Sequence, residues 1–322
     1  MNERSLVGAL VVITGASSGI GRAAAMAFSR QGARLVLAAR DAEALEEVAA
    51  ECRQLGAEAL AMPTDMTQSE SVEQLAIAAG EFGYGRVDVW INNAGVGAVG
   101  AFDETPLDAH ERVVQTDLLG YLRGAHSVLP YFKQQRSGVL INTLSVGSWL
   151  AQPYAVAYSA SKFGLVGFSR ALRNELTQWP DIHVCDVYPF IVDTPGFRDG
   201  GNYAGRSLKP PSPLTDPRTV AEAMVSLARR PRHSTSIGLM ATLMRLTHFF
   251  TPLVEPIYGP VVGKALDRAS RMPTSSGNLF HPPMGQRRID GGWRDERSSA
   301  RLMLAGALAA GVVSALLLRR KG

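Results

Sequence analysis

A tyrosine and a lysine stand four residues apart in the segment AYSASK, with only small residues between Tyr158 and Lys162. In a helix, positions i and i+4 lie on the same face, so the phenol and the ammonium can act on one object. A tyrosine phenol has a reference pKa of about 10 and is a poor acid or base at neutral pH. Because a neighbouring ammonium favours the phenolate, the pair predicts a group that passes a proton to or from an oxygen.

A second candidate site is the segment TGASSGIG at residues 14–21. It follows a short apolar run and precedes a helical pattern, so it lies where a strand turns into a helix. Gly15, Gly19 and Gly21 let the backbone approach a ligand closely, and a helix N-terminus offers unpaired N–H groups and the positive end of a dipole. The segment therefore predicts a binding site for the pyrophosphate of a dinucleotide.

The elements that must position these residues alternate between apolar strands and helices over residues 1–240. Strands that are apolar on both faces, joined by helices, indicate a parallel sheet covered on both sides. The predicted fold class is α/β, a Rossmann-type doubly wound parallel sheet with helices on both faces, followed by a C-terminal helical extension. The expected strands are 10–14, 34–39, 58–62, 87–92, 138–143 and 183–188, and the first two expected helices are 19–31 and 42–55.

Three motifs occur in a fixed order: TGASSGIG at 14–21, NNAG at 92–95 and YSASK at 158–162. Together they resemble the short-chain dehydrogenase/reductase family, in its short single-domain branch, over roughly residues 5–240. The resemblance implies a nicotinamide-dependent oxidoreductase that interconverts an alcohol and a ketone or aldehyde.

The resemblance also implies roles for individual residues. Tyr158 is expected to exchange the proton, and Lys162 to favour its phenolate and to hydrogen-bond the nicotinamide ribose. Ser145 lies at the family's spacing for the serine that steadies the substrate oxygen. Asp117 stands where family members usually carry an asparagine that bends a helix and holds a water linked to the lysine. We expect its carboxylate to keep Lys162 protonated but to oppose the phenolate, so Asp117→Asn should keep or raise activity.

The residues after the second strand bear on the choice of coenzyme. In dinucleotide folds an acid there receives the ribose hydroxyls of NAD, whereas a cation accommodates the 2'-phosphate of NADP. Ala39 takes the place of the acid and Arg40 follows it, with Arg22 as a second cation. NADP(H) is therefore favoured over NAD(H). Asp41, next to Arg40, is the feature that opposes this choice.

Other coenzyme contacts follow from the resemblance alone. Asp65 is expected to hold the adenine edge, residues 92–95 to line the ribose side, and Thr194 to contact the carboxamide. Phe190 stands where the family usually has glycine, which predicts a different loop backbone. The residues expected to bind the coenzyme are Gly15, Ser17, Ser18, Gly19, Ile20, Gly21, Arg40, Asp65, Met66, Asn92, Ala94, Gly95, Tyr158, Lys162 and Thr194.

Composition and charge argue against several other classes of protein. With 46% apolar and 19% charged residues, the chain is typical of a globular protein. Its two cysteines, Cys52 and Cys185, give no disulfide framework, and no metal-ligand spacing occurs, so no metal is expected. Residues 285–322 carry eight Lys and Arg against three acids, whereas residues 1–284 carry 25 against 26. A near-neutral body argues against nucleic acid, and its basic end favours a membrane surface.

Residues 302–318 contain no charge. As a helix they would extend about 26 Å, close to the bilayer core of about 30 Å, and flanking arginines can reach the interface. They predict a C-terminal transmembrane helix with the catalytic domain in the cytoplasm, and a buried core helix is the alternative. No N-terminal signal peptide is expected. The expected organisation is 1–240 dinucleotide-binding catalytic domain, 241–271 apolar helical extension, 272–301 polar basic linker and 302–318 transmembrane helix.

The leading hypothesis is a membrane-anchored, NADP(H)-dependent reductase and alcohol dehydrogenase for a small lipid-like or steroid-like molecule. The family resemblance also implies a homo-oligomer. A 3-ketoacyl-thioester reductase shares every motif and is the alternative enzyme. A non-catalytic NADP(H)-binding regulatory or scaffold protein is the alternative from another class, against which the intact Ser145, Tyr158 and Lys162 argue.

Overall fold

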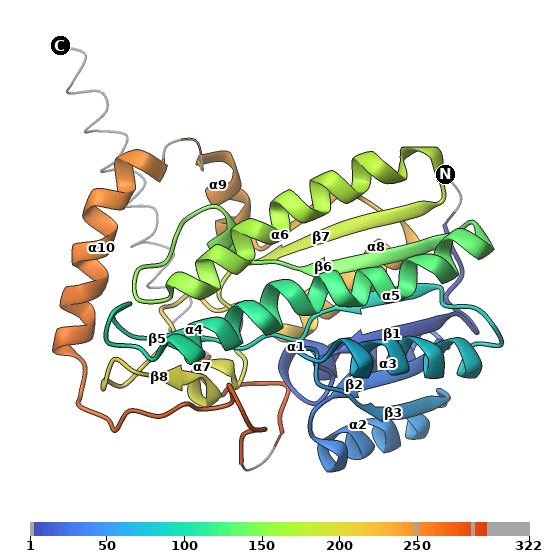
Figure 1. The fold of residues 1–322 in the computed structure, drawn as a ribbon, viewed down its shortest axis with the longest axis horizontal. Helices are drawn as coiled ribbons and strands as arrows, with labels where there is room; N and C mark the ends of the chain where they lie inside the picture. The colour runs from blue at the N-terminus through green and yellow to red at the C-terminus, as the bar shows by residue number, and fades with distance from the viewer. Residues whose placement is uncertain (1–2, 248, 250, 285–286, 295–322) are drawn as a thin grey trace.

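A parallel sheet between two layers of helices forms the body of the protein, as seen in a computed structural model that describes residues 3–247, 249, 251–284 and 287–294 (Figure 1). The sheet has the order β3-β2-β1-β4-β6-β7-β9, and its paired strands run parallel. Its strands are β1 (Leu10–Thr14), β2 (Arg34–Ala39), β3 (Ala59–Pro63), β4 (Val89–Asn92), β6 (Gly138–Thr143), β7 (Ile182–Pro189) and β9 (Ser234–Ile237).

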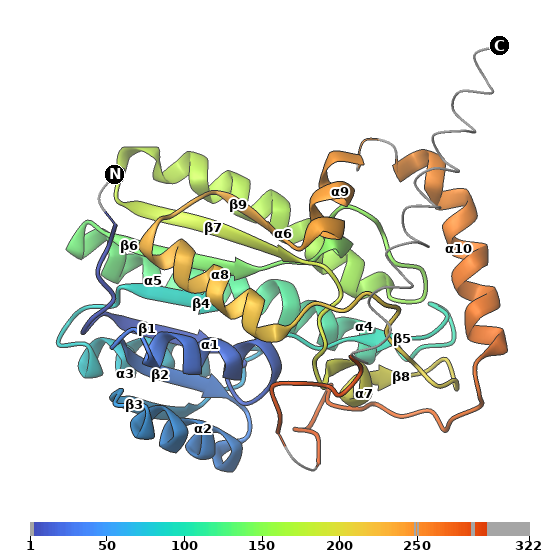
Figure 2. The same ribbon diagram turned by 180° about the vertical axis from the view of Figure 1, so that it is seen from behind.

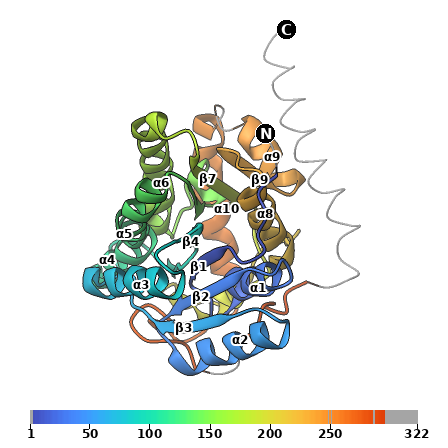
Figure 3. The same ribbon diagram turned by 90° about the vertical axis from the view of Figure 1, so that its right-hand side faces the viewer.

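The two helical layers cover opposite faces of this sheet (Figure 2, Figure 3). One layer holds α1 (Gly19–Ser29), α2 (Ala42–Gln54) and α8 (Pro217–Arg229). The other holds α3 (Ser69–Phe82), α4 (Leu107–Val114), α5 (Gly120–Gln135) and α6 (Val156–Glu175), with a π-helical turn, Gln115–Leu119, between α4 and α5.

Alternate residues of each strand pack into the two layers. Val11 and Ile13 belong to the apolar cluster that contains α1 and α8, whereas Leu10 and Val12 belong to the cluster that contains α3 and α5. Side chains of a strand point alternately to the two faces, so a strand buried on both faces must be apolar throughout. The predicted doubly wound α/β fold is confirmed.

The site-bearing loops meet at one edge of the sheet. β1 lies between β2 and β4, so the chain winds outward in opposite directions from it. The carboxyl ends of parallel strands share one edge, and a crevice for ligands opens where the winding direction changes. The turn after β1 and the loops after β4 and β6 therefore come together, although their sequences lie far apart.

The chain beyond the sheet turns back toward this edge. It forms α9 (Leu239–Thr247) and α10 (Thr251–Arg268), and the segment after α10 then returns past β8 (Gly201–Asn202) and α7 (Gly196–Asp199) toward α1 (Figure 1, Figure 2). β8 pairs with β5 (Ala98–Val99), and Ser275 bridges to Asn202. The described part of the polar segment predicted as a linker thus packs along the body.

Within the described ranges, no helix has both the length and the apolar character needed to cross a bilayer. The predicted transmembrane helix, 302–318, lies outside the described residues, as do residues 295–301 of the predicted linker.

Candidate active site

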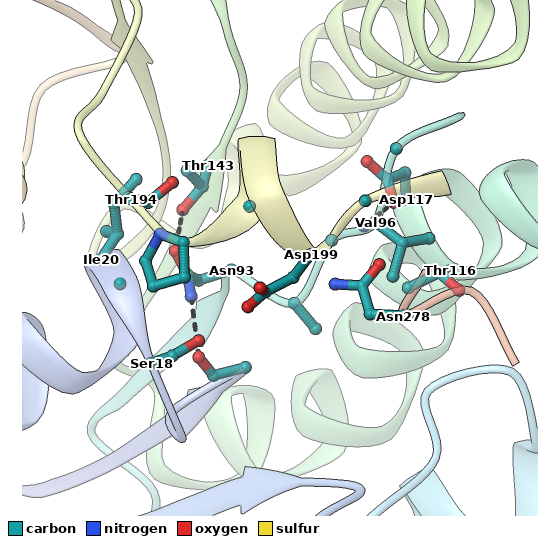
Figure 4. A pocket seen from close by; sticks show the side chains of 18 of the residues that line it. Ser18, Ile20, Asn93, Val96, Thr116, Asp117, Thr143, Thr194, Asp199 and Asn278 are labelled. Carbon is teal, nitrogen blue, oxygen red and sulfur yellow. Dashed lines mark hydrogen bonds between the residues drawn. The ribbon is translucent and has the colours of Figure 1, made fainter. Parts of the chain in front are cut away.

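A cavity of about 420 Å³ lies at the carboxyl edge of the sheet, and most of the predicted site residues line it. Figure 4 shows part of its wall, with Ser18, Asp117 and Thr194 among the labelled side chains. Its wall is formed by the loops that follow β1, β2, β3, β4, β6 and β7. The predicted residues found on this wall are Gly15, Ser17, Ser18, Gly19, Ile20, Arg40, Asp65, Met66, Ala94, Gly95, Asp117, Ser145, Tyr158, Lys162 and Thr194.

The glycine-rich turn forms one side of the cavity because side chains have no room there. Gly15 has a φ of 67°, and a Cβ added to it would lie 2.7 Å from Ala94 Cα. A Cβ added to Gly21 would lie only 2.1 Å from the carbonyl oxygen of Gly15. Gly21 is therefore not on the wall but behind it, where it lets α1 begin close to the turn. This backbone cradle at a helix N-terminus fits the pyrophosphate of a dinucleotide.

Asn92 does not line the cavity, contrary to its predicted contact with the coenzyme. Its side chain is buried, where it accepts a hydrogen bond from Trp90 Nε1 at 2.8 Å and donates to Asn142 Oδ1 at 3.0 Å. The bond to Asn142 ties β4 to β6 inside the sheet. Asn93 lies on the wall instead, with its Nδ2 donating to the carbonyl of Thr14 at 3.1 Å.

Ser145 and Tyr158 face a common space at the inner end of the cavity. Ser145 Oγ accepts a hydrogen bond from Gly147 N at 3.1 Å, which fixes the serine at the end of β6. A Cβ added to Gly147 would lie 3.0 Å from Gln152 Nε2, 3.3 Å from Tyr158 Cε1 and 3.5 Å from Ser145 Oγ. Because Gly147 has no side chain, these three side chains are not crowded where they line the cavity.

Lys162 lies one helical turn after Tyr158 on α6, and its ammonium is buried. Nζ donates to the carbonyl of Thr143 at 3.2 Å and lies 5.5 Å from the centre of the Tyr158 ring. Burial opposes the charge of Lys162, but Tyr121 and Asp117 favour it and leave the pKa of Lys162 above its ordinary value. The lysine therefore carries a positive charge beside the phenol at neutral pH.

Asp117 occupies the π-helical turn and is fully buried (Figure 4). Its Oδ1 accepts a hydrogen bond from Val96 N at 2.8 Å, and its Oδ2 lies 3.5 Å from Lys162 Nζ. Burial raises the pKa of Asp117 above its ordinary value, although the lysine and the Val96 N–H oppose this shift. A carboxyl group that titrates nearer to neutral pH thus lies beside the lysine.

Asp65 lies at the outer end of the cavity with its charge well compensated. Its carboxylate accepts hydrogen bonds from Thr67 N and from Arg112 Nη2, both at 2.9 Å. Burial would raise its pKa, but these bonds and the charge of Arg112 together hold the pKa of Asp65 below its ordinary value. Asp65 is thus an ionised acceptor at the cavity wall.

Arg40 lies at the end of β2, as predicted, but its partners come from a distant part of the chain. Its guanidinium donates to the carbonyl oxygens of Asn278 at 2.5 Å and Leu279 at 2.9 Å. Asn278, Pro282 and Arg287 also line the cavity. This contribution was not predicted, because backbone carbonyls leave no signature in the sequence.

The segment after Asn278 also reaches the glycine-rich turn. Gly19 N donates to the carbonyl of Arg288 at 2.9 Å. Farther along, Trp293 N and Arg294 Nε donate to the buried carboxylate of Asp193, each at 3.0 Å. We call residues 276–284 and 287–294 the C-terminal strap. The strap borders the cavity from its nucleotide end to the start of α1.

Comparison with known proteins identifies the family. The model of the short chain dehydrogenase family matches residues 9–201, more than half of the chain, so the chain belongs to this family. It is 28% identical over 318 residues to the uncharacterized oxidoreductase YxnA of Bacillus subtilis, covering 95% of this chain and 89% of that protein.

Solved structures agree with this assignment. An alcohol dehydrogenase from Thermococcus sibiricus, complexed with 5-hydroxy-NADP, is 30% identical with a TM-score of 0.62, covering 71% of this chain and 94% of its own. A short chain dehydrogenase/reductase from Burkholderia phymatum, in complex with NAD, is 27% identical with a TM-score of 0.68. The match covers 78% of this chain and 96% of that chain. The family predicted from the three motifs is confirmed, and the protein is an oxidoreductase of the kind that acts on CH–OH and C=O groups.

Proposed function

We propose that the protein is an NADP(H)-dependent oxidoreductase that interconverts a hydrophobic ketone or aldehyde and the corresponding alcohol. The observation that carries the proposal is that Ser145, Tyr158 and Lys162 line the same cavity as the glycine-rich turn. A proton donor for the carbonyl oxygen and a cradle for a dinucleotide thus face one space.

The residues on the wall support a proposed place for each part of the coenzyme. The glycine-rich turn and the start of α1 would hold the pyrophosphate, Asp65 and Met66 the adenine, and Arg40 the 2'-phosphate. Gly95 and Lys162 would hold the nicotinamide ribose. When bound, NADPH supplies a hydride to the carbonyl carbon of the substrate.

The protein residues handle the proton that balances this hydride. Ser145 donates a hydrogen bond to the carbonyl oxygen and orients it toward Tyr158. The Tyr158 hydroxyl gives its proton to the same oxygen as negative charge develops there. The buried ammonium of Lys162 stabilises the phenolate that remains, and alcohol oxidation reverses these steps.

The substrate end of the cavity is lined mainly by apolar side chains. Val146 follows Ser145, and Phe190 follows β7, where the sequence predicted an unusual loop. Leu208 and Phe197 lie on the same wall. These side chains favour an apolar carbonyl compound over a small charged one because burial of apolar surface drives binding.

The absorbance of NADPH at 340 nm tests this proposal. The purified protein is offered a long-chain aldehyde, a cyclic ketone and a 3-ketoacyl thioester, each with NADPH and with NADH. We expect turnover of the apolar carbonyls with NADPH, and a loss of at least 10³-fold in Tyr158→Phe with NADPH binding retained. Turnover of the thioester alone would favour the alternative enzyme, and no turnover by the wild type would favour a binding protein.

Attachment to a membrane and assembly into oligomers are further parts of the proposal. We propose that residues 302–318 anchor the protein by its C-terminus and that the catalytic domain, residues 1–240, lies in the cytoplasm as a homo-oligomer. The support is the uncharged sequence of residues 302–318. Cell fractionation of the full chain and of a chain that ends at Ala300 tests the anchor. If both remain in the soluble fraction, the proposed anchor is wrong.

A further inference from the structure

The nucleotide end of the cavity continues into a hollow between the start of α2 and the C-terminal strap. Arg40, Asp41 and Arg287 line both the cavity and this hollow, so the two spaces adjoin. The hollow holds charges of both signs. Its charged residues are Arg22, Arg40, Arg287, Asp41, Glu43 and Glu47.

Hydrogen bonds hold the strap in place over this hollow. Arg40 donates to two strap carbonyls, those of Asn278 and Leu279. Arg22, on α1, donates to the carbonyl of Arg287 at 2.5 Å. The two arginines that the sequence analysis assigned to the phosphate therefore also position the strap, and Arg22 fixes the backbone from which the Arg287 side chain extends.

The side chain of Arg287 pairs with the carboxylate of Asp41. Asp41 directly follows Arg40 and caps α2, accepting a hydrogen bond from Ala44 N at 3.1 Å. Burial opposes its ionisation, but the bonds from Arg287 and Ala44 hold the pKa of Asp41 below its ordinary value. Asp41 is thus an anion, and Arg287 is the cation that compensates it.

An uncompensated carboxylate here would select the wrong coenzyme. A carboxylate after the second strand accepts hydrogen bonds from the ribose hydroxyls of NAD and repels the 2'-phosphate of NADP. Asp41 lies one residue beyond Arg40 and, like Arg40, lines both the cavity and the hollow. The pairing with Arg287 occupies a carboxylate oxygen of Asp41 and compensates its negative charge.

We propose that Arg287 is a specificity-determining residue, delivered by the C-terminal strap, that neutralises Asp41 and so makes the hollow beside Arg40 accept the 2'-phosphate of NADP(H). This inference rests on the proposed NADP(H) dependence. It assigns part of the selection between coenzymes to a residue 246 positions away from its partner. The strap is therefore part of the coenzyme site.

Equilibrium binding to the full-length protein tests the inference without any substrate. The dissociation constants of NADPH, NADH, 2',5'-ADP and 5'-AMP are measured for the wild type, Arg287→Ala, Asp41→Asn and the double variant. Arg230→Ala is the control, since it removes an arginine that pairs with a carboxylate, that of Glu3, and neither residue lines the cavity or the hollow. Thermal melting of each variant verifies that it is folded.

We expect Arg287→Ala to raise the dissociation constants of NADPH and 2',5'-ADP about tenfold, which corresponds to about 1.4 kcal/mol. Those of NADH and 5'-AMP should stay within twofold or fall. In the Asp41→Asn background, Arg287→Ala should raise the dissociation constant of NADPH threefold or less. Arg230→Ala should leave all four dissociation constants as they are in the wild type.

The inference would be overturned if Arg287→Ala weakened the binding of NADPH and NADH equally, or left the preference for NADPH over NADH unchanged. It would also be overturned if Arg287→Ala weakened NADPH binding as much in the Asp41→Asn background as in the wild type. A wild type that binds NADH as tightly as NADPH would instead contradict the proposed coenzyme itself. The two failures are therefore distinguishable.

Discussion

Asp117→Asn replaces a buried carboxyl group by an amide of the same shape. The amide oxygen can still accept the hydrogen bond from Val96 N, so the π-helical turn that holds the residue is preserved. What changes is the charge beside Lys162, whose Nζ lies 3.5 Å from Asp117 Oδ2. The substitution therefore isolates the effect of one negative charge on the catalytic group.

The size of that effect follows from two distances. Lys162 Nζ lies 3.5 Å from the carboxylate oxygen and 5.5 Å from the centre of the Tyr158 ring. The carboxylate is therefore no more than about 9 Å from the ring centre and no more than about 12 Å from the phenolate oxygen beyond it, which at an effective dielectric constant of about 20 gives a repulsion of at least about 1.4 kcal/mol. When ionised, Asp117 opposes the Tyr158 phenolate by at least this amount, which is equivalent to about one pH unit.

The sign of the pH dependence follows from the raised pKa of Asp117. At low pH the carboxyl group is protonated and exerts no repulsion, and the repulsion appears as the pH rises through that pKa. Without it, alcohol oxidation by Asp117→Asn should reach its half-maximal rate about one pH unit lower than in the wild type. The plateau rate should be kept or raised.

Initial rates of alcohol oxidation between pH 6 and pH 10, with saturating NADP, measure this shift. Asp88→Asn is the control, because this half-exposed aspartate caps the opposite edge of the sheet by accepting a hydrogen bond from Leu10 N. A midpoint that stays in place or moves to higher pH in Asp117→Asn would refute the reasoning. A more than tenfold loss of turnover would do the same.

Two further substitutions test other parts of the site. Gly147→Val places a branched side chain against Gln152, the Tyr158 ring and Ser145, all of which line the cavity. Steady-state kinetics should therefore show a KM for bulky ketones raised at least tenfold, with the dissociation constant of NADPH within twofold of the wild type. Unchanged KM values would show that substrate does not enter there. Asp193→Ala removes the buried acceptor of Trp293 N and Arg294, so trypsin should cut the C-terminal strap at least fivefold faster than in the wild type, and equal cleavage rates would contradict the anchoring role.

The central strands could be predicted because their residues are apolar on both faces. β1, β2 and β6 begin and end where the sequence predicts. β9 was missed because its sequence, STSI, has no apolar run, and it only has to pair with one neighbour at the edge of the sheet. Its place is set by pairing with β7, which is a tertiary contact.

Some residues of the candidate site could be predicted from the sequence around them, whereas others depend on contacts with distant parts of the chain. Tyr158 and Lys162 could be predicted from one motif within a single helix, and Ser145 from its spacing before Tyr158. Asn92 and Asn93 are adjacent in NNAG, and only the direction of the strand determines which one is buried and which faces the cavity. The strap could not be predicted, because its contacts with Arg40 use backbone carbonyls 238 and 239 residues away.

Transfer of an isotope label from the coenzyme tests the central claim most directly. NADPH carrying deuterium at both hydrogen positions of nicotinamide C4 is mixed with an apolar ketone and the enzyme, and the alcohol is analysed by mass spectrometry. The account predicts an alcohol one mass unit heavier, formed by the wild type and at least 10³-fold more slowly by Tyr158→Phe. An alcohol without deuterium, or equal rates for the two proteins, would contradict the account.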